Sequence, residues 1–217
     1  MTHPSNPGRA DRRPLLTQLG TGSPTAGDDC ACLVICNAIR WASHGRVGPK
    51  SQGEVKEWVR QIRSWARKPT GGLLMFGDCL EVYRHPDLHR AFDRAGAPPF
   101  SAGYFQGVSW DGVKGGLYND RLIHLAIDYH VLRKGAAPMG STTFNGGHSV
   151  ALLGAQNSRG RVYTNVADPL FDGRRAGIPD GWQVARLREY RAAAGAWGAR
   201  PAGEGKATII AVKRGVK

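Results

Sequence analysis

Long apolar runs are absent from this sequence of 217 residues. The longest uncharged, mainly apolar stretch covers residues 30–39, about half the length that a membrane-spanning helix needs. The first residues, MTHPSNPGRADRRP, also lack the apolar centre of a secretory signal. We therefore expect a protein that is cytoplasmic at synthesis and makes no membrane contact.

Cysteine is scarce: the chain has four, too few for a disulfide scaffold, and no Cys-x-x-Cys pair. Three of them stand close together in GDDCACLVICNAIRWA, residues 27–42. On a helix, Cys32 lies about 200° and Cys36 about 240° around the axis from Cys30, so the three thiols do not converge on one zinc ion. We expect reduced thiols and neither a metal nor another cofactor.

Acidic residues are few, 17 against 30 basic ones, which gives a net charge of +13. Such a field attracts polyanions, and a polyanion contact through the basic surface is one expectation. The basic residues are scattered, however, and no aromatic-and-basic motif of a nucleic-acid module accompanies them. Residues 1–14 are expected to form an extended basic arm, and residues 15–217 a single domain.

The pattern along the chain predicts an α+β fold. Residues 30–43 are apolar on nearly all sides, which indicates a buried helix whose first turn Asp28 or Asp29 could cap. Further helices are expected within 51–69 and over 78–95, with a helix passing into a strand in 117–134. GGHSVALLGA and RVYTNVADP, joined by QNSRG, predict a hairpin, and KATIIAV predicts one more strand. We expect the N-terminal buried helix to pack on a C-terminal antiparallel sheet.

Cys30 has the best position for a nucleophile. Free cysteines are commonly small core residues, and this interpretation suits Cys32 and Cys36. Cys30 instead stands where a glycine-containing loop meets the first turn of the buried helix. The unpaired amides and the helix dipole there favour a thiolate and lower its pKa.

A thiolate nucleophile needs a histidine as its proton carrier and a third group to hold that histidine. Of the seven histidines, His148 stands after two glycines and before an apolar strand. If the hairpin turn is centred on Ser158, Asp168 lies directly opposite His148 and on the same face. The alternative for Asp168 is a turn residue ahead of Pro169, and for His124 a structural role.

These motifs resemble those of a known family. An acid-Cys pair at the start of a buried helix, a later Gly-His-x-Val strand and an Asp-Pro some twenty residues beyond are similar to the papain-like cysteine peptidases. The resemblance is nearest to the bacteriocin leader-processing (double-glycine) peptidases, and it covers residues 15–217. ADPLFDGRRAGIP is also similar to papain-like domains of actinobacterial phage proteins.

The resemblance implies a two-lobed papain-like fold and a set of site residues. Cys30 would be the nucleophile, His148 the general base and acid, Asp168 the orienting group and Gln18 the oxyanion-hole side chain. Three features depart from the branch: Ala31 stands where it usually has glycine, Gln18 lies twelve residues ahead of the cysteine instead of about six, and Cys32 is an extra thiol close to Cys30. The alternative for Gln18 is an ordinary loop residue.

Three functions follow as hypotheses. The leading one is a thiol hydrolase acting on a peptide, on a peptidoglycan cross-link or on virion proteins. The second is a structural virion component, in the tail or tail tip, that has a papain-like fold and little activity. In either case the arm could contact other virion proteins. The third is acyl transfer, because transglutaminases and arylamine acetyltransferases also order Cys, His and Asp along the chain.

Overall fold

The computed structural model describes residues 16, 21–128, 147–170, 183–195 and 206–215. Its α-helices are α1 (Cys30–Ala42), α2 (Val55–Trp65), α3 (Phe76–Arg84), α4 (Pro86–Arg94), α5 (Trp110–Tyr118) and α7 (Leu187–Gly195). Its strands are β1 (Phe100–Ser109), β2 (Arg121–Asp128), β3 (Gly147–Ser158), β4 (Arg161–Ala167), β5 (Gln183–Arg186) and β6 (Lys206–Arg214). The predicted arm, residues 1–14, and Gln18 lie outside the described residues.

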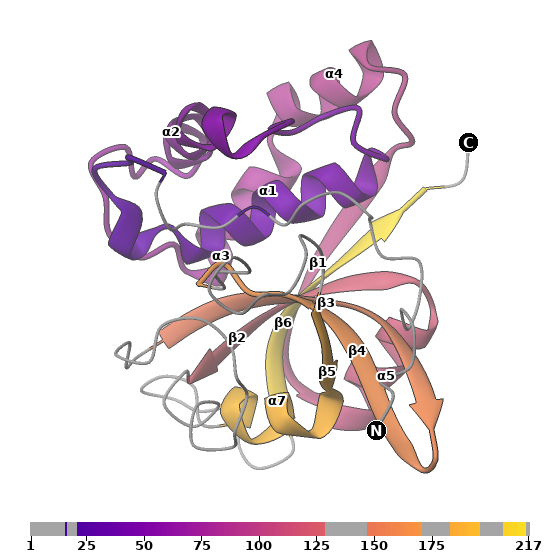
Figure 1. The fold of residues 1–217 in the computed structure, drawn as a ribbon. Helices are drawn as coiled ribbons and strands as arrows, with labels where there is room; N and C mark the ends of the chain where they lie inside the picture. The colour runs from indigo at the N-terminus through magenta and orange to yellow at the C-terminus, as the bar shows by residue number, and fades with distance from the viewer. Residues whose placement is uncertain (1–15, 17–20, 129–146, 171–182, 196–205, 216–217) are drawn as a thin grey trace.

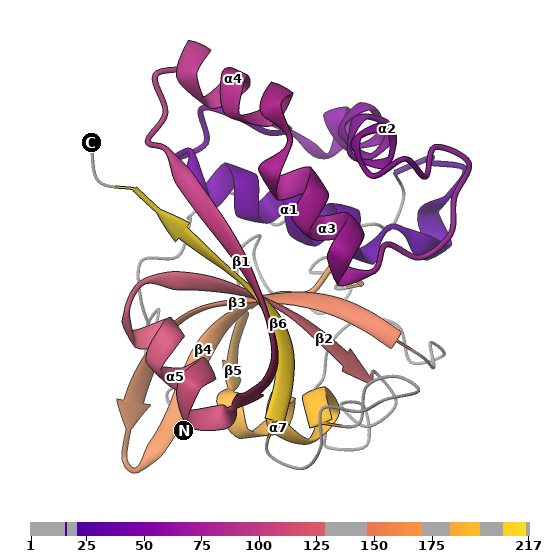
Figure 2. The ribbon, with the colours of Figure 1, turned by 180° about the vertical axis from the view of Figure 1, so that it is seen from behind.

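Within the described residues, the six strands form one antiparallel sheet in the order β1-β6-β2-β3-β4-β5. Helices α1 to α4 lie on one side of it and α5 and α7 on the other (Figures 1 and 2). Alternate residues of a strand contribute to two separate hydrophobic cores, one on each face of the sheet, because successive side chains of a strand point to opposite faces. On β2, for example, Leu122 packs with the α1 side and Ile123 with the α5 and α7 side. The predicted α+β class is confirmed.

Helix α1 is the centre of the first core. It begins at Cys30 as predicted, and all thirteen of its residues are buried. A helix without a polar face is stable only when protein surrounds it, and here α2, α3 and the sheet cover α1. The position of Cys30 is therefore fixed by a helix that is anchored along its whole length.

Two predictions about elements are wrong. The helix expected over 78–95 is two helices, because Pro86 keeps the preceding residue out of the helical region and His85 has a ψ of 130°. The sheet is also not confined to the C-terminal part of the chain. Strand β2 was expected, because it follows α5 within residues 117–134, where a helix was predicted to pass into a strand, but β1 was not. Among the described residues, the glycine-containing strand β1 pairs only with β6 at the sheet edge, and its largely exposed residues give no alternating pattern.

The β3–β4 hairpin is present, but its turn is displaced from the predicted centre at Ser158. Ser158 pairs with Arg161, so the turn consists of Arg159 and Gly160, whose φ angles are 50° and 73°. Positive φ at both positions is the type I′ geometry that suits a two-residue hairpin. A bulge at Gly154, with φ 66°, then moves the register back by one residue, so that the offset from the predicted pairing falls from three residues to two.

No helix in the described part of the chain is both long enough and apolar enough to span a membrane.

Candidate active site

Cys30 is the first residue of α1, and 8% of its surface is exposed. The predicted cap is wrong: Asp29 occupies the N-cap position, but no side chain caps the helix. The Asp29 carboxylate instead accepts a hydrogen bond from Thr25 and pairs with Arg63. The amides of the first turn therefore carry no capping carboxylate, which favours negative charge at the Cys30 sulfur.

His148 and Asp168 form a buried pair. The His148 Nε2 atom lies 2.7 Å from Asp168 Oδ1, and both side chains are fully buried. The same oxygen accepts the Leu170 amide at 2.9 Å, which fixes the carboxylate beyond the end of β4. Asp168 thus both holds the histidine and shapes the turn after Pro169, so the two roles considered for it are compatible.

The register of this pair differs from the prediction. Ala151 pairs with Ala167, so continuing the same register places Asp168 level with Val150 and not with His148. The contact is diagonal, two residues along the strand, which is within reach of a histidine side chain. An offset of two residues leaves both side chains on the predicted common face, and for that reason the pair still forms.

His148 acts on the Cys30 thiol both electrostatically and as a hydrogen-bonding group, and both effects favour the thiolate. Burial raises the pKa of Cys30, but His148 and the backbone amides of Ser149 and Ala31 together lower it below the ordinary thiol value. Because Asp168 occupies Nε2, Nδ1 is the ring nitrogen that is left to interact with the sulfur. Cys30, His148 and Asp168 therefore form one connected chain of side chains.

The histidine shows the complementary shift. Burial lowers the pKa of His148, but the Asp168 charge and hydrogen bond, together with Cys30, outweigh burial and raise the pKa to about 9. Thiol and imidazole thus shift in opposite directions, as expected for a thiolate–imidazolium pair. Such a pair supplies a nucleophile and a proton donor at neutral pH.

No histidine that the structure describes lowers the thiol pKa of the other three cysteines. All four thiols are free and buried. Burial raises the pKa of Cys32, Cys36 and Cys79 well above the ordinary value. Among the described residues, no group of three or more His, Cys, Asp or Glu side chains is placed to hold a metal ion.

The prediction that Gln18 lines the site stays a prediction, since residues 17–20 lie outside those the structure describes. The nearby Leu16 is described, and it is firmly anchored. Asn37 of α1 accepts a hydrogen bond from the Leu16 amide at 3.3 Å and donates one to the Leu16 carbonyl at 3.2 Å. Leu16 is therefore tied to the nucleophile helix about two turns after Cys30.

The sequence interpretation missed Arg63, which is 1% exposed. A signal was available, because Arg63 follows Val59 by one helical turn and shares its face with Val55 and Val59. A cation on the apolar face of an amphipathic helix needs a buried partner, and Asp29 is that partner.

His124 has the structural role considered for it. Its side chain is fully buried, its Nδ1 atom lies 3.4 Å from the Tyr83 hydroxyl, and its ring contacts Phe76 edge-on at 5.4 Å. Burial lowers the pKa of His124 to about 3, so the ring is neutral at physiological pH. It belongs to the packing between α3 and the sheet.

Protein-family models and curated proteins were both searched, and neither search gave a match to this chain. The assignment of the site therefore depends on the geometry around Cys30.

Proposed function

We propose that the protein is a thiol-dependent amide hydrolase of the papain-like type. The observation that carries this proposal is the connected set Cys30–His148–Asp168, with 2.7 Å between the last two side chains. The arrangement of the domain also supports it. Cys30 comes from the helical layer of α1 to α4, whereas His148 comes from β3 and Asp168 directly follows β4, so the site lies between the helical layer and the sheet (Figure 1).

In the proposed reaction, the Cys30 thiolate attacks the carbonyl carbon of the scissile amide. The C=O π electrons move to the oxygen, and the resulting oxyanion is stabilised by the Cys30 amide and by Gln18. Collapse of this intermediate breaks the C–N bond as the His148 imidazolium transfers its proton to the leaving amine. A thioester to Cys30 and a neutral imidazole remain.

The second half of the reaction uses water. Neutral His148 takes a proton from a water molecule, and the hydroxide formed adds to the thioester carbonyl. Collapse expels the Cys30 thiolate, releases the carboxylic acid and leaves His148 protonated, which restores the starting state. Asp168 remains ionised throughout; it orients the ring and stabilises the imidazolium.

The proposed substrate is a peptide bond, either in a cell-wall cross-link or in a virion protein. The resemblance to papain-like domains of phage proteins supports this choice. The net charge of +13 supports it further, because bacterial walls carry anionic polymers to which a basic protein is attracted. On this proposal the enzyme is encoded by a phage and can be part of the virion.

The test is digestion of purified peptidoglycan and of a mixed peptide library, followed by mass spectrometry of the new termini. Wild type should release amines and carboxylic acids from at least one substrate. Cys30→Ala, His148→Ala and iodoacetamide-treated wild type should release none. Cys36→Ala, which removes a buried thiol two turns along α1, is the matched control and should stay active. Equal product from wild type and Cys30→Ala would overturn the proposal.

A further inference from the structure

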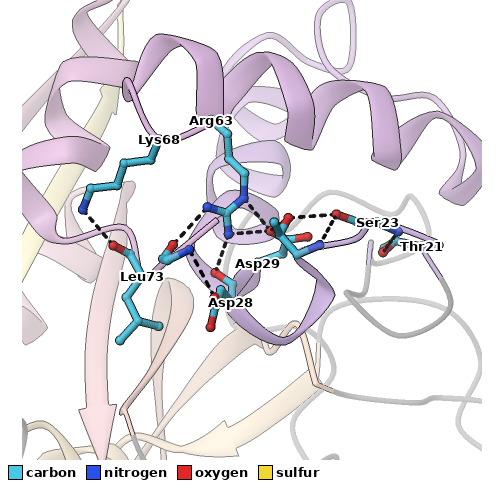
Figure 3. Close-up of polar contacts among 9 residues, drawn as sticks. Thr21, Ser23, Asp28, Asp29, Arg63, Lys68 and Leu73 are labelled. Carbon is cyan, nitrogen blue, oxygen red and sulfur yellow. Dashed lines mark hydrogen bonds and ion pairs between the residues drawn. The ribbon is translucent and has the colours of Figure 1, made fainter. Parts of the chain in front are cut away.

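Arg63 connects three parts of the chain, one of which directly precedes Cys30 in the sequence (Figure 3). Its Nε and Nη2 atoms lie 2.8 Å and 2.7 Å from Oδ1 of Asp29. Its Nη2 also donates to the Asp28 carbonyl at 3.2 Å, and its Nη1 donates to the Gly72 carbonyl at 2.9 Å. One guanidinium therefore joins α2, the start of α1 and the segment that precedes α3.

A second bond closes this arrangement. The Gly72 amide donates to Oδ2 of Asp28 at 3.2 Å, so both main-chain groups of Gly72 are bound. Thr25 adds a hydrogen bond to Oδ1 of Asp29 at 2.9 Å. The residues just before Cys30 are thus held from the side of α2 and from the side of Gly72.

The Arg63–Asp29 pair is fully inside the protein, with side-chain exposures of 2% and 0%. A buried ion pair is not in itself a gain in stability, because hydrophobic residues of similar volume often serve as well. Loss of one partner is a different matter, since it leaves an uncompensated charge. Here that charge would belong to Asp29, the residue next to the nucleophile.

The charges of this pair act on the Cys32 thiol in the first turn of α1. There burial raises the pKa most, Arg63 lowers it and Asp29 raises it. In the intact protein the two charges oppose each other. An unpaired carboxylate at the same place would oppose the formation of negative charge on a neighbouring sulfur.

We propose that Arg63 is a positioning residue: it neutralises Asp29 and fixes the first turn of α1, so that His148 stabilises the Cys30 thiolate without opposition from the preceding carboxylate. This inference deepens the proposed function of the same site and depends on it for its catalytic meaning.

The other charged or titratable groups around Cys30 come from each element packed against it. His148 of β3 favours the thiolate, and Asp168 acts through His148. From α3, Cys79 interacts electrostatically with Cys30, and from α1 itself comes Cys32. None of these groups changes when Arg63 or Asp29 is replaced, so a change in the thiol titration reports on the pair.

The experiment measures the rate of Cys30 alkylation by iodoacetamide between pH 4 and pH 10 on the intact chain, with the adduct located by mass spectrometry. Arg63→Met should move the midpoint of the profile upward by about one pH unit, because it leaves Asp29 unpaired. Asp29→Asn should move it downward, because Arg63 then remains as an unpaired cation. The double variant, which carries neither charge, should return close to wild type.

Two further variants complete the design. Arg63→Lys keeps the charge and should titrate close to wild type even if it packs less well. Arg60→Met is the matched control: it lies one turn earlier on α2 in an exposed pair with Glu57, and it should leave the profile unchanged. If Arg63→Met does not fold, two results still decide the question. They are the downward shift of the midpoint in Asp29→Asn and its return toward the wild-type value in the double variant.

A merely structural role predicts a different result. Loss of packing would shift Arg63→Met and Asp29→Asn in the same direction, or would lower the folded fraction and leave the midpoint unchanged. Either result overturns the proposal. Failure of the proposed function would show separately. The midpoint of Cys30 alkylation in wild type would then lie at the pH of an ordinary thiol, and His148→Ala would not change it. The opposite shifts of the Arg63 and Asp29 variants would still be measurable in that case.

Discussion

The Nε2 atom of His148 lies 2.7 Å from Oδ1 of Asp168, with both side chains fully buried. A carboxylate in this position fixes the ring orientation and leaves the other ring nitrogen for the interaction with Cys30. Because burial alone would neutralise the imidazole, Asp168 is the group that keeps it charged. The activity of the site should therefore depend on a residue that never touches the substrate.

Replacing Asp168 by Asn should keep the fold and slow hydrolysis. The Asn side chain preserves the shape, and its oxygen can still accept the hydrogen bond from the Leu170 backbone amide. The substitution removes the negative charge that stabilises the imidazolium. We expect kcat to fall by roughly 10²- to 10⁴-fold, the range of general acid–base catalysis. Steady-state kinetics on the substrate found by digestion measures this change. Asp111→Asn, at an exposed pair with Lys114, is the control, and an equal loss there would contradict the assignment.

The pH profile should show the titration of His148. Its pKa of about 9 in the folded protein lies above the ordinary value of 6.5, so hydrolysis should decline as the pH rises through about 9 and the imidazolium is lost. The charged pair should also stabilise the fold fully below pH 6.5, and this contribution should disappear as the pH rises to about 9. Asp168→Asn should move the alkaline limb of kcat to lower pH. An alkaline limb that stays in place in that variant would disprove the coupling.

Only Cys30 should react rapidly with iodoacetamide at pH 6. Its pKa is lowered by His148 and by two backbone amides, whereas burial raises the pKa of Cys32, Cys36 and Cys79. Peptide mapping after a brief exposure should find a single adduct, and His148→Ala should remove the fast reaction. The three other thiols should label only in denaturant. Labelling of Cys32 at the same rate as Cys30 would argue against the choice of nucleophile.

His124 should make the protein sensitive to acid. Its pKa is about 3 in the folded state and near 6.5 when unfolded, so the unfolded chain binds an extra proton between these values. The free energy of unfolding should therefore fall by about 1.4 kcal/mol for each pH unit below 6.5 from this residue alone. Urea denaturation of His124→Phe between pH 6.5 and pH 5 should show a shallower dependence than wild type. His89→Phe is the comparison at a partly exposed histidine, and the same slope in both variants would rule out this role.

The sequence predicted the parts of the fold in which composition alone decides the outcome. Helix α1 has no polar face, so the sequence predicted both that this segment is helical and that it is buried. Its predicted start at Cys30 is confirmed. Strand β1 was not predicted, because an exposed edge strand with glycines has neither an apolar run nor a regular alternation of apolar and polar residues. The break before Pro86 was readable in the sequence, since a proline restricts the residue ahead of it.

The pairing of His148 with Asp168 was predicted for a reason that is only partly right. The turn at Arg159 and Gly160 lacks the Asn-Gly signal of a type I′ hairpin, and the bulge at Gly154 changes the register again. The two departures leave a net offset of two residues, which preserves the face but not the alignment. Arg63 could not be assigned a partner at all, because 34 residues separate it from Asp29 and only the packing of α2 on α1 brings them together.

The last prediction concerns Gln18, whose role in the oxyanion hole follows from the family resemblance. Asn37 of α1 holds both main-chain groups of Leu16, which stands two residues before Gln18 in the sequence. If the Gln18 amide donates to the oxyanion, Gln18→Ala should lower kcat by about 10²- to 10³-fold with little change in KM. The rate of Cys30 alkylation at pH 6 should stay that of wild type, since the thiolate depends on His148 and not on the oxyanion hole. Gln61→Ala, on the exposed side of α2, is the control and should be fully active. A Gln18→Ala enzyme with unchanged kcat would remove the side chain from the site and leave the Cys30 amide as the donor there.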